Sequence, residues 1–462
     1  MKFSVITLGC DKNTVDSERY LAELADRGGE PTDIVEEADV ILVNTCGFID
    51  AAKRESIDAI VQAGRLKEAG RAQAVVAVGC MVERHRSELA EALPEVDLFL
   101  GASEMDRLVP ELVERGFIDD APVPHPGVRL YSGELPHIRY LKVSEGCDHG
   151  CAFCAIPLMR GKHRSFALED VVREAQLLEA QGAREVNLVA QDLAHFGRDR
   201  RGTGESLPTL LEALVRETGI PWIRMLYLYS AGITPRLLEL VATEARIMPY
   251  FDMPMQHGSD AVLQRMRRPE RNSTIREKVA RIREIVPDVA IRTTCIVGFP
   301  GETDEDFETL LRLLEETQFD RVGAFAYSPQ EGTAASDSYE DDVPESLKYE
   351  RLERLNELQR LITTDCFEQR IGRTVRAMVD RVDGESIEAR ATWQAHEIDG
   401  TTALGSGLWA LKPGDVVDAR IDGLVDDYDL SAVVMNVVSQ SSEPIAPSRP
   451  GRALPLASAF GR

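Results

Sequence analysis

The sequence has no hydrophobic run that approaches the roughly 18 residues of a membrane-spanning helix. Its first apolar stretch, residues 3–8, is also shorter than the apolar core of a secretory signal, which is roughly 7–15 residues long. We therefore expect residues 3–8 to form a strand, and the protein to have neither a membrane span nor a membrane partner.

Basic residues are scarce. There are 53 Lys and Arg against 78 Asp and Glu, which leaves a formal net charge of −25. A charge of this sign repels a phosphate backbone unless a local basic patch compensates for it. The balance does not favour direct nucleic-acid binding and instead favours a basic partner.

Cysteine is scarce as well, with eight in 462 residues. In a large chain without an export signal, these thiols predict a reducing compartment, the cytoplasm, and metal ligation rather than disulfides. Cys295 and Cys366 have no partner at metal-binding spacing, so we expect both to be structural. The other six fall into two groups of three.

Cys147, Cys151 and Cys154 lie in one short segment, separated by spacers of three and two residues. Thiolates select soft metals, and iron–sulfur clusters are held mainly by cysteines. Three sulfurs leave one iron of a four-iron cluster open, and an open coordination position is typical of a reactive metal centre. The alternative is a structural zinc site in which His149 is the fourth ligand.

The first 120 residues alternate short apolar runs with amphipathic stretches, which predicts a parallel α/β domain with its functional loops at the carboxyl ends of the strands. The expected strands are residues 3–8, 38–43 and 74–78, and the expected helices are residues 16–26, 48–63 and 82–92.

Cys10, Cys46 and Cys80 each follow the end of one of these strands, 36 and 34 residues apart. Equivalent strand ends share one edge of a parallel sheet, so the three sulfurs can form a second metal site. The alternative is three unrelated buried cysteines, each of which would be unremarkable by itself.

Four prolines between residues 122 and 136 predict a linker over residues 121–137. Residues 138–368 then alternate six strands with helices, which predicts a partial (β/α)6 barrel whose first strand leads into the Cys147 loop, on the side where such barrels place active sites. The expected strands are residues 139–143, 186–189, 223–229, 250–254, 290–297 and 322–327, and the clearest helices are residues 168–180, 304–316 and 345–369.

Residues 370–438 alternate short strands with glycine-bearing turns, which predicts a small antiparallel β-barrel. Prolines, serines and glycines make up much of residues 439–462, which we expect to be irregular. The fold class is therefore α/β and multidomain.

The Cys147 loop resembles the signature of radical S-adenosylmethionine (SAM) enzymes, Cys-x3-Cys-x2-Cys with an aromatic residue before the last cysteine. Phe153 occupies that aromatic position. The resemblance implies a 4Fe-4S cluster whose free iron binds SAM, and one electron that cleaves SAM to a 5′-deoxyadenosyl radical.

Two cysteine triplets, a radical SAM barrel and a terminal β-barrel together resemble the methylthiotransferase family over residues 1 to about 438. In that family the terminal barrel is called TRAM. The resemblance implies that Cys10, Cys46 and Cys80 hold a second 4Fe-4S cluster, whose open iron carries the sulfur that is inserted into the substrate.

Further residues match SAM-binding positions of the family. Gln191 and Asp192 end the second barrel strand and could hold the SAM ammonium group, although Asp192 could equally cap a helix. Gly298, Gly301 and Glu302 end the fifth strand, where glycines allow the backbone to approach the adenosine.

Three basic residues follow the cluster loop. Cations there could meet a carboxylate, but we expect solvated charges; the residues are Arg160, Lys162 and Arg164.

The segment around Cys10 resembles the branch of the family that modifies an aspartate of small-subunit ribosomal protein uS12, because Lys12 and Asn13 follow the first cysteine. The branch that modifies transfer RNA commonly has Gln-Met-Asn there, and Asp11 departs from the proline usual in the uS12 branch. We therefore expect a protein methylthiotransferase that acts on the β-carbon of an aspartate. The alternatives are a transfer RNA adenosine methylthiotransferase and, as a non-enzyme, an iron–sulfur electron carrier or scaffold.

The charge of the predicted TRAM barrel bears on the same choice. Residues 373–440 contain twelve acidic and six basic residues, a net charge of −6, whereas a barrel that binds RNA should carry a basic face. This balance favours a basic ribosomal protein as substrate, although an ordinary solvated acidic surface would have the same composition. A reductant protein is the other expected partner.

Overall fold

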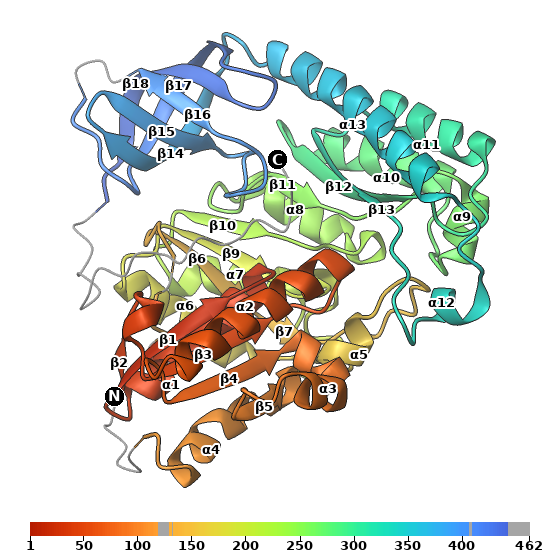
Figure 1. The fold of residues 1–462 in the computed structure, drawn as a ribbon. Helices are drawn as coiled ribbons and strands as arrows, with labels where there is room; N and C mark the ends of the chain where they lie inside the picture. The colour runs from red at the N-terminus through yellow and green to blue at the C-terminus, as the bar shows by residue number, and fades with distance from the viewer. Residues whose placement is uncertain (119–128, 132, 406–408, 442–462) are drawn as a thin grey trace.

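A computed structural model of the chain describes residues 1–118, 129–131, 133–405 and 409–441 (Figure 1). Much of the predicted linker, residues 121–137, and most of the predicted tail, residues 439–462, lie outside these ranges. Among the described residues, no helix combines the length and apolar character that crossing a membrane requires.

The amino-terminal part is a five-stranded parallel sheet with helices on both faces. Helices α1 (Asp11–Ala25) and α4 (Leu108–Glu114) cover one face, and α2 (Asp50–Glu68) and α3 (Cys80–Ala92) cover the other. The strand order is β2 (Glu30–Pro31), β1 (Lys2–Thr7), β3 (Val40–Thr45), β4 (Ala74–Gly79), β5 (Leu98–Gly101).

Coverage on both faces explains the sequence of the central strands. Every residue of β3 and β4 is buried, so both strands consist of nearly continuous apolar residues, as in other parallel sheets. Within β3, Val40 and Leu42 pack on the α1 side, whereas Ile41 and Val43 pack on the α2 side.

The middle part is the expected partial barrel. Two parallel sheets, β6-β9-β10 and β11-β12-β13, adjoin where Ile223 bridges to Ile247. The strands are β6 (Ile138–Lys142), β9 (Glu185–Val189), β10 (Trp222–Met225), β11 (Tyr250–Asp252), β12 (Ala290–Val297) and β13 (Arg321–Ala326). A short antiparallel pair, β7 (Ser144–Glu145) and β8 (Arg164–Ser165), flanks the cluster loop.

Helices surround this partial barrel on the outside (Figure 1). They are α6 (Leu168–Ala180), α7 (Leu207–Glu217), α8 (Pro235–Thr243), α9 (Asp260–Arg265), α10 (Asn272–Ile285), α11 (Asp304–Thr317), α12 (Ala334–Ser338) and α13 (Glu345–Glu368), and α5 (Ile156–Arg160) follows the cluster loop.

Two elements differ from the sequence-based expectation near the site. The strand expected over residues 223–229 ends at Met225, because Tyr227 has a φ of 61°, which an extended strand does not allow. The first helix begins at Asp11 and not at residue 16, so Cys10 is its N-cap residue.

The terminal barrel is closed by five strands in the order β14-β15-β16-β18-β17. The predicted small antiparallel barrel is confirmed, with four antiparallel strand pairs and one parallel pair, β16 with β18. An odd number of strands in a closed ring cannot alternate direction throughout, so one parallel pair is unavoidable. The strands are β14 (Thr374–Asp383), β15 (Ser386–Ala391), β16 (Thr402–Gly405), β17 (Val416–Leu424) and β18 (Leu430–Ser439).

A buried charge network joins the terminal barrel to the partial barrel. Glu185 at the start of β9 accepts hydrogen bonds from Arg224 at 2.8 Å and from Arg390 of β15 at 2.6 Å. Arg390 also donates to Asp380 at 2.6 Å, and His137 contacts the same carboxylate at 3.0 Å. Burial alone would raise the pKa of Asp380, but Arg390 and His137 lower it well below its usual range.

We expect Glu185→Gln to destabilise the protein strongly. The change leaves two arginines buried without their shared carboxylate, and breaking a buried ion pair in this way costs about 3–5 kcal/mol. Urea denaturation followed by circular dichroism should show a midpoint at clearly lower urea. The control is Arg281→Ala, which removes an exposed pair with Glu284 and should cost less than about 1 kcal/mol. Equal midpoints for the two variants would contradict this account.

Candidate active site

The first cysteine trio lies at one edge of the amino-terminal sheet. Strands β1, β3 and β4 are neighbours and run parallel, so Cys10, Cys46 and Cys80 follow three adjacent strand ends. Cys10 is the N-cap residue of α1, and Cys80 is the first residue of α3. The amino-terminal end of a helix favours negative charge, as thiolate ligands require.

The backbone around this trio is closely packed. A Cβ atom on Gly9 would lie 2.9 Å from the Cys46 Sγ atom, and Gly9 has a φ of 94°, so a side chain is excluded there on both counts. The Cys46 N–H group donates to the Ser56 hydroxyl at 3.0 Å, which holds the turn after β3.

Lys12 and Asn13, which indicated the uS12 branch, lie at the sheet edge that carries the first cysteine trio. The Asn13 amide donates to the carbonyl oxygens of Leu8 at 2.7 Å and Thr45 at 3.2 Å, so it ties the end of β1 to the end of β3. The Lys12 ammonium lies 3.2 Å from the centre of the Tyr227 ring in the partial barrel.

The trio has the chemistry of a metal site. Burial, together with the neighbouring Cys10 and Cys80, raises the pKa of the Cys46 thiol to about 12. Burial also raises the pKa of Cys80, although Arg160 opposes this. Neighbouring thiolates are stable together only when a cation offsets their mutual repulsion, and a donor set of three sulfurs fits an iron–sulfur cluster.

The second trio occupies the loop between β7 and α5. A Cβ atom on Gly146 would lie 2.1 Å from the Lys162 carbonyl oxygen, so the loop can close only with glycine there. The backbone of Ala152 holds the loop in the barrel, because its N–H group donates to the Met266 carbonyl at 2.9 Å and its carbonyl accepts from the Ala335 N–H group at 2.7 Å.

The sulfurs of this loop also fit a cluster. Burial and the neighbouring cysteines raise the pKa of Cys147 to about 11 and that of Cys154 to about 12. The Arg268 guanidinium lies 3.7 Å from the Cys151 sulfur and stacks on the Tyr229 ring at 4.2 Å. The loop therefore combines three thiols with one nearby cation.

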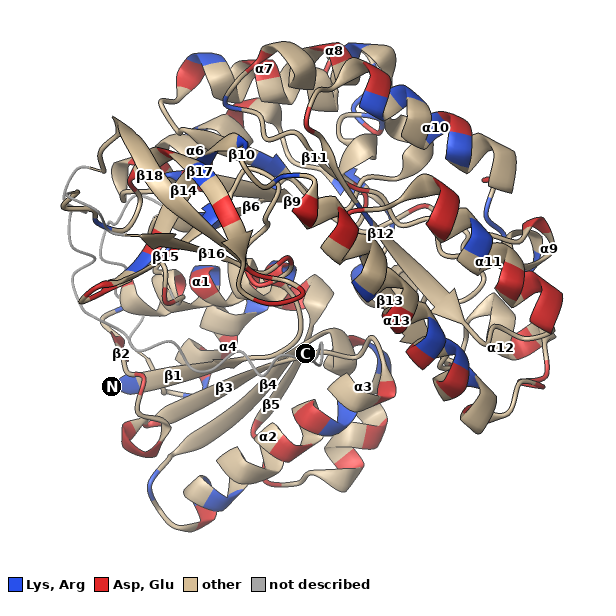
Figure 2. Cartoon of the chain, turned by 90° about the horizontal axis from the view of Figure 1, so that it is seen from above, with Lys and Arg blue, Asp and Glu red and all other residues tan. Residues whose placement is uncertain are grey.

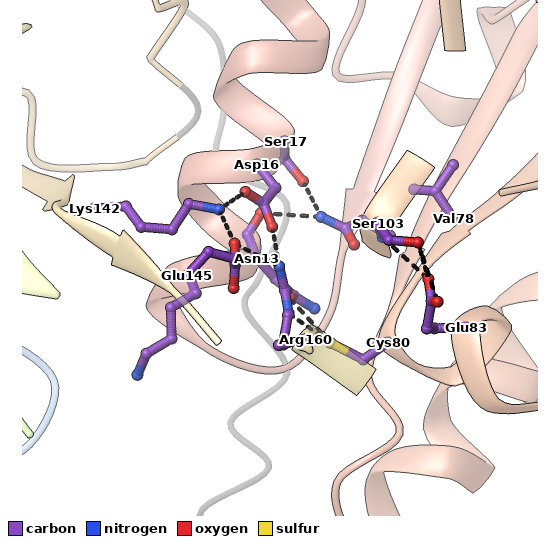
Figure 3. A network of polar contacts seen from close by, with 12 residues as sticks. Asn13, Asp16, Ser17, Val78, Cys80, Glu83, Ser103, Lys142, Glu145 and Arg160 are labelled. Atoms are coloured by element: carbon purple, nitrogen blue, oxygen red, sulfur yellow. Dashed lines mark hydrogen bonds and ion pairs between the residues drawn. The ribbon is translucent and has the colours of Figure 1, made fainter. Parts of the chain in front are cut away.

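The two trios adjoin. Cys80 packs against Ala155, which follows Cys154 in the chain, and against Met159 of α5. Arg160, the last residue of α5, donates its Nε–H group to the Cys80 sulfur at 3.0 Å, as Figure 3 shows. The segment that follows Cys154, including helix α5, therefore contacts the first trio at Cys80.

The predicted SAM contacts at the end of β9 have partners within the protein. The Gln191 amide donates to Glu145 at 2.9 Å. Asp192 caps a short 3-10 helix, as the alternative interpretation held, and it also contacts the rings of His149 at 2.7 Å and His195 at 3.0 Å. His149 therefore directs its Nε2 atom to a carboxylate, while its ring stacks on Tyr229.

The turn after β12 is held by Glu302. Its carboxylate is fully buried, accepts from the N–H groups of Gly298 at 2.7 Å and Phe299 at 3.2 Å, and pairs with Arg351 at 3.0 Å. Gly298 and Gly301 both have positive φ angles. Phe153 packs against the apolar cluster that contains Phe299. Contact of these residues with SAM stays a prediction.

Three residues that lie at or near the cysteine sites were not predicted from the sequence. Arg160 was expected to be solvated, and this was wrong, because its side chain is 4% exposed. Lys162 and Arg164 are exposed as expected. Arg268 and Tyr229 carried no signal, because Arg268 reaches Cys151 across 117 residues of sequence and Tyr229 was assigned to a strand.

Comparisons with known families match three consecutive parts of the chain. Residues 2–101 match the family described as "Uncharacterized protein family UPF0004". Residues 141–314 match the Radical SAM superfamily, and residues 371–435 match the TRAM domain. The order agrees with the three parts of the fold.

Solved structures share the fold at low sequence identity. The radical SAM methyltransferase TsrM from Kitasatospora setae, with tryptophan substrate and a SAM analogue bound, has a TM-score of 0.53 at 14% identity. That alignment covers 83% of this chain and 79% of TsrM. The same protein with cobalamin and a [4Fe-4S] cluster bound has a TM-score of 0.51.

Curated relatives cover nearly the whole chain. The ribosomal protein uS12 methylthiotransferase RimO of Anaeromyxobacter sp. (strain K) is 42% identical over 459 residues, which is 98% of this chain and 95% of the relative. The RimO protein of Geobacter sulfurreducens is 41% identical over 94% of this chain and 99% of its own length. The chain therefore belongs to the RimO family of methylthiotransferases within the radical SAM superfamily.

Proposed function

We propose that this protein adds a methylthio group to the β-carbon of an aspartate in ribosomal protein uS12. The observation that carries the proposal is the juxtaposition of two three-cysteine sites, with Cys80 against the helix that follows Cys154. The similarity to RimO proteins along the full length supports the choice of substrate.

Each cysteine trio is assigned to one cofactor. Cys147, Cys151 and Cys154 would hold the 4Fe-4S cluster that binds SAM, and Cys10, Cys46 and Cys80 would hold the second cluster. When bound, these groups supply a carbon-centred radical and a sulfur donor. A radical is needed because an unactivated C–H bond offers no acidic proton that a base could remove. Cys80 is buried and the other five cysteines are partly buried, which limits the access of water to the reacting groups.

The SAM molecule is assigned to the mouth of the partial barrel. Gln191 and Asp192 would face its amino-acid part, and Phe153 and the turn of Gly298 and Gly301 would face its adenosine. Glu302 would act by holding that turn, since its carboxylate is satisfied by two backbone N–H groups and Arg351.

Charge supports a basic protein as the substrate. Acidic residues outnumber basic ones in the whole chain, and the ribbon in Figure 2 marks Asp and Glu positions, beside Lys and Arg positions, on helices of the partial barrel such as α7, α10 and α11. A uS12 substrate would place the reaction in the cytoplasm, with a reductant protein as the electron source.

We propose that the chain is divided into five parts. They are an amino-terminal α/β domain, residues 1–120; a linker, residues 121–137; the radical SAM domain, residues 138–368; the TRAM barrel, residues 370–438; and a tail, residues 439–462.

The direct test offers the anaerobically reconstituted protein, SAM and a reductant to uS12 and to transfer RNA in separate reactions. We expect a methylthio mass increment on one aspartate of uS12 and none on RNA. Mass spectrometry of the peptide and of the digested nucleosides gives the answer. An increment found only on RNA would overturn the proposal in favour of the transfer RNA alternative.

Cys151→Ala should abolish formation of 5′-deoxyadenosine, because it removes one sulfur of the trio assigned to SAM cleavage. Chromatography of the quenched reaction measures this product. Cys295→Ala is the matched control, since Cys295 is buried in β12 and has no assigned ligand role. Normal SAM cleavage by Cys151→Ala would contradict the assignment of this trio.

Cys46→Ala should separate the role of the first cysteine trio from that of the second. We expect it to retain some 5′-deoxyadenosine formation and to lose sulfur insertion, because the Cys147 loop is intact. Iron and sulfide analysis should also find about half the content of the unaltered protein. Methylthiolation that survives this change would remove the first trio from the reaction.

A further inference from the structure

Arg160 lies between the two cysteine sites and belongs to neither ligand set. It ends α5, six residues after Cys154, and its side chain is 4% exposed. Figure 3 shows its guanidinium group among residues of α1, β6 and the first residue of α3. A buried cation in this position needs an electrostatic reason.

The donors of Arg160 are directed to specific acceptors. Nε–H points to the Cys80 sulfur at 3.0 Å, one Nη–H group to Asp16 at 2.7 Å, and the other to the Asn13 side-chain oxygen at 2.5 Å. The Nη atom that donates to Asp16 also lies 3.4 Å from the Glu145 carboxylate. The planar guanidinium is suited to such a fixed set of acceptors, whereas a lysine ammonium is not.

Arg160 and the charged side chains around it balance without any contribution from Cys80. Lys142 pairs with Asp16 and also with Glu145, at 2.7 Å for the latter, so two cations face two carboxylates. Burial would raise the pKa of Asp16, but Lys142 and Arg160 lower it. The two remaining hydrogen bonds of Arg160 are directed to the neutral Asn13 side chain and to the Cys80 sulfur.

A hydrogen bond to a cluster sulfur and a nearby positive charge both stabilise the reduced, more negative form of an iron–sulfur cluster. The effect is strong where water is excluded, as it is around Arg160. We propose that Arg160 is a positioning residue of the cluster held by Cys10, Cys46 and Cys80, and that its hydrogen bond to Cys80 raises that cluster's reduction potential. The inference rests on the proposed assignment of this trio.

Arg160 also links the two sites mechanically. From the Cys80 sulfur, hydrogen bonds lead through Arg160 to Glu145, and Glu145 accepts from Gln191 at 2.9 Å. Glu145 is two residues before Cys147. The side chain that touches the first trio is thus connected to the segment that carries the second.

The test is a redox titration of the cluster bound by the first trio, followed by electron paramagnetic resonance in the full-length chain. A Cys151→Ala background removes the signal of the other cluster. We expect Arg160→Gln to lower the ratio of reduced to oxidised cluster at a fixed potential about tenfold, which is ~59 mV for one electron. Arg160→Lys keeps the charge and loses the Nε–H donor, so it should give a smaller decrease.

Two further variants separate electrostatics from disruption. Lys162→Ala removes the same unit of charge two residues away on an exposed side chain, and the ratio should stay within about twofold. Asp16→Asn removes an anion and keeps the Arg160 bond to Cys80, so the ratio should rise. A merely structural network would shift the Arg160 and Asp16 variants in the same direction.

An unchanged ratio in Arg160→Gln, or a decrease in both Arg160→Gln and Asp16→Asn, would overturn the inference. If Arg160→Gln binds no iron at this site, the test uses Arg160→Lys and Asp16→Asn instead. The inference then requires the ratio of reduced to oxidised cluster to fall in Arg160→Lys and to rise in Asp16→Asn. A protein in which the Cys151→Ala background itself holds no cluster would instead refute the proposed function, so the two failures are distinguishable.

Discussion

The structure depends on one constraint, which is that three partly or fully buried sulfurs are brought together at each of two sites. Buried thiols resist ionisation, as the raised pKa values of Cys46, Cys147 and Cys154 show, and adjacent thiolates repel one another. The chain meets the constraint in two ways. One trio comes from three neighbouring strand ends, and the other from a single loop that closes over Gly146.

Joining the two sites requires the amino-terminal sheet and the partial barrel to be held in one orientation. Helix α1 provides much of this, because Asp16 pairs with Lys142 and Arg160, and Glu18 pairs with Arg139 at 3.3 Å. Such buried ion pairs fix an orientation through their directional hydrogen bonds, even where they add little net stability. The Lys12 contact with Tyr227 lies along the same boundary.

The terminal barrel is joined to the partial barrel by buried polar groups rather than by an apolar face alone. Glu185 and Arg390 connect β9 to β15, and the Tyr250 hydroxyl donates to Asp399 at 2.6 Å. These contacts lie at the start of the barrel strands, whereas the cysteine loop follows the carboxyl end of β6. The acidic terminal barrel is thus attached firmly without entering the cluster sites.

Local spacing in the sequence determined the Cys147 loop, and the strand–helix alternation determined the shared edge of Cys10, Cys46 and Cys80, because both patterns depend on neighbours in the chain and on the geometry of parallel strands. The boundaries of α6 and β12 followed from periodicity for the same reason. Only the tertiary structure decided that Arg160 is buried against Cys80, that Arg268 reaches Cys151, and that Glu302 holds its own turn. The partners of the two arginines lie 80 and 117 residues away, so no local pattern encodes them. Their surroundings exist only once separate sheets have packed together and excluded water.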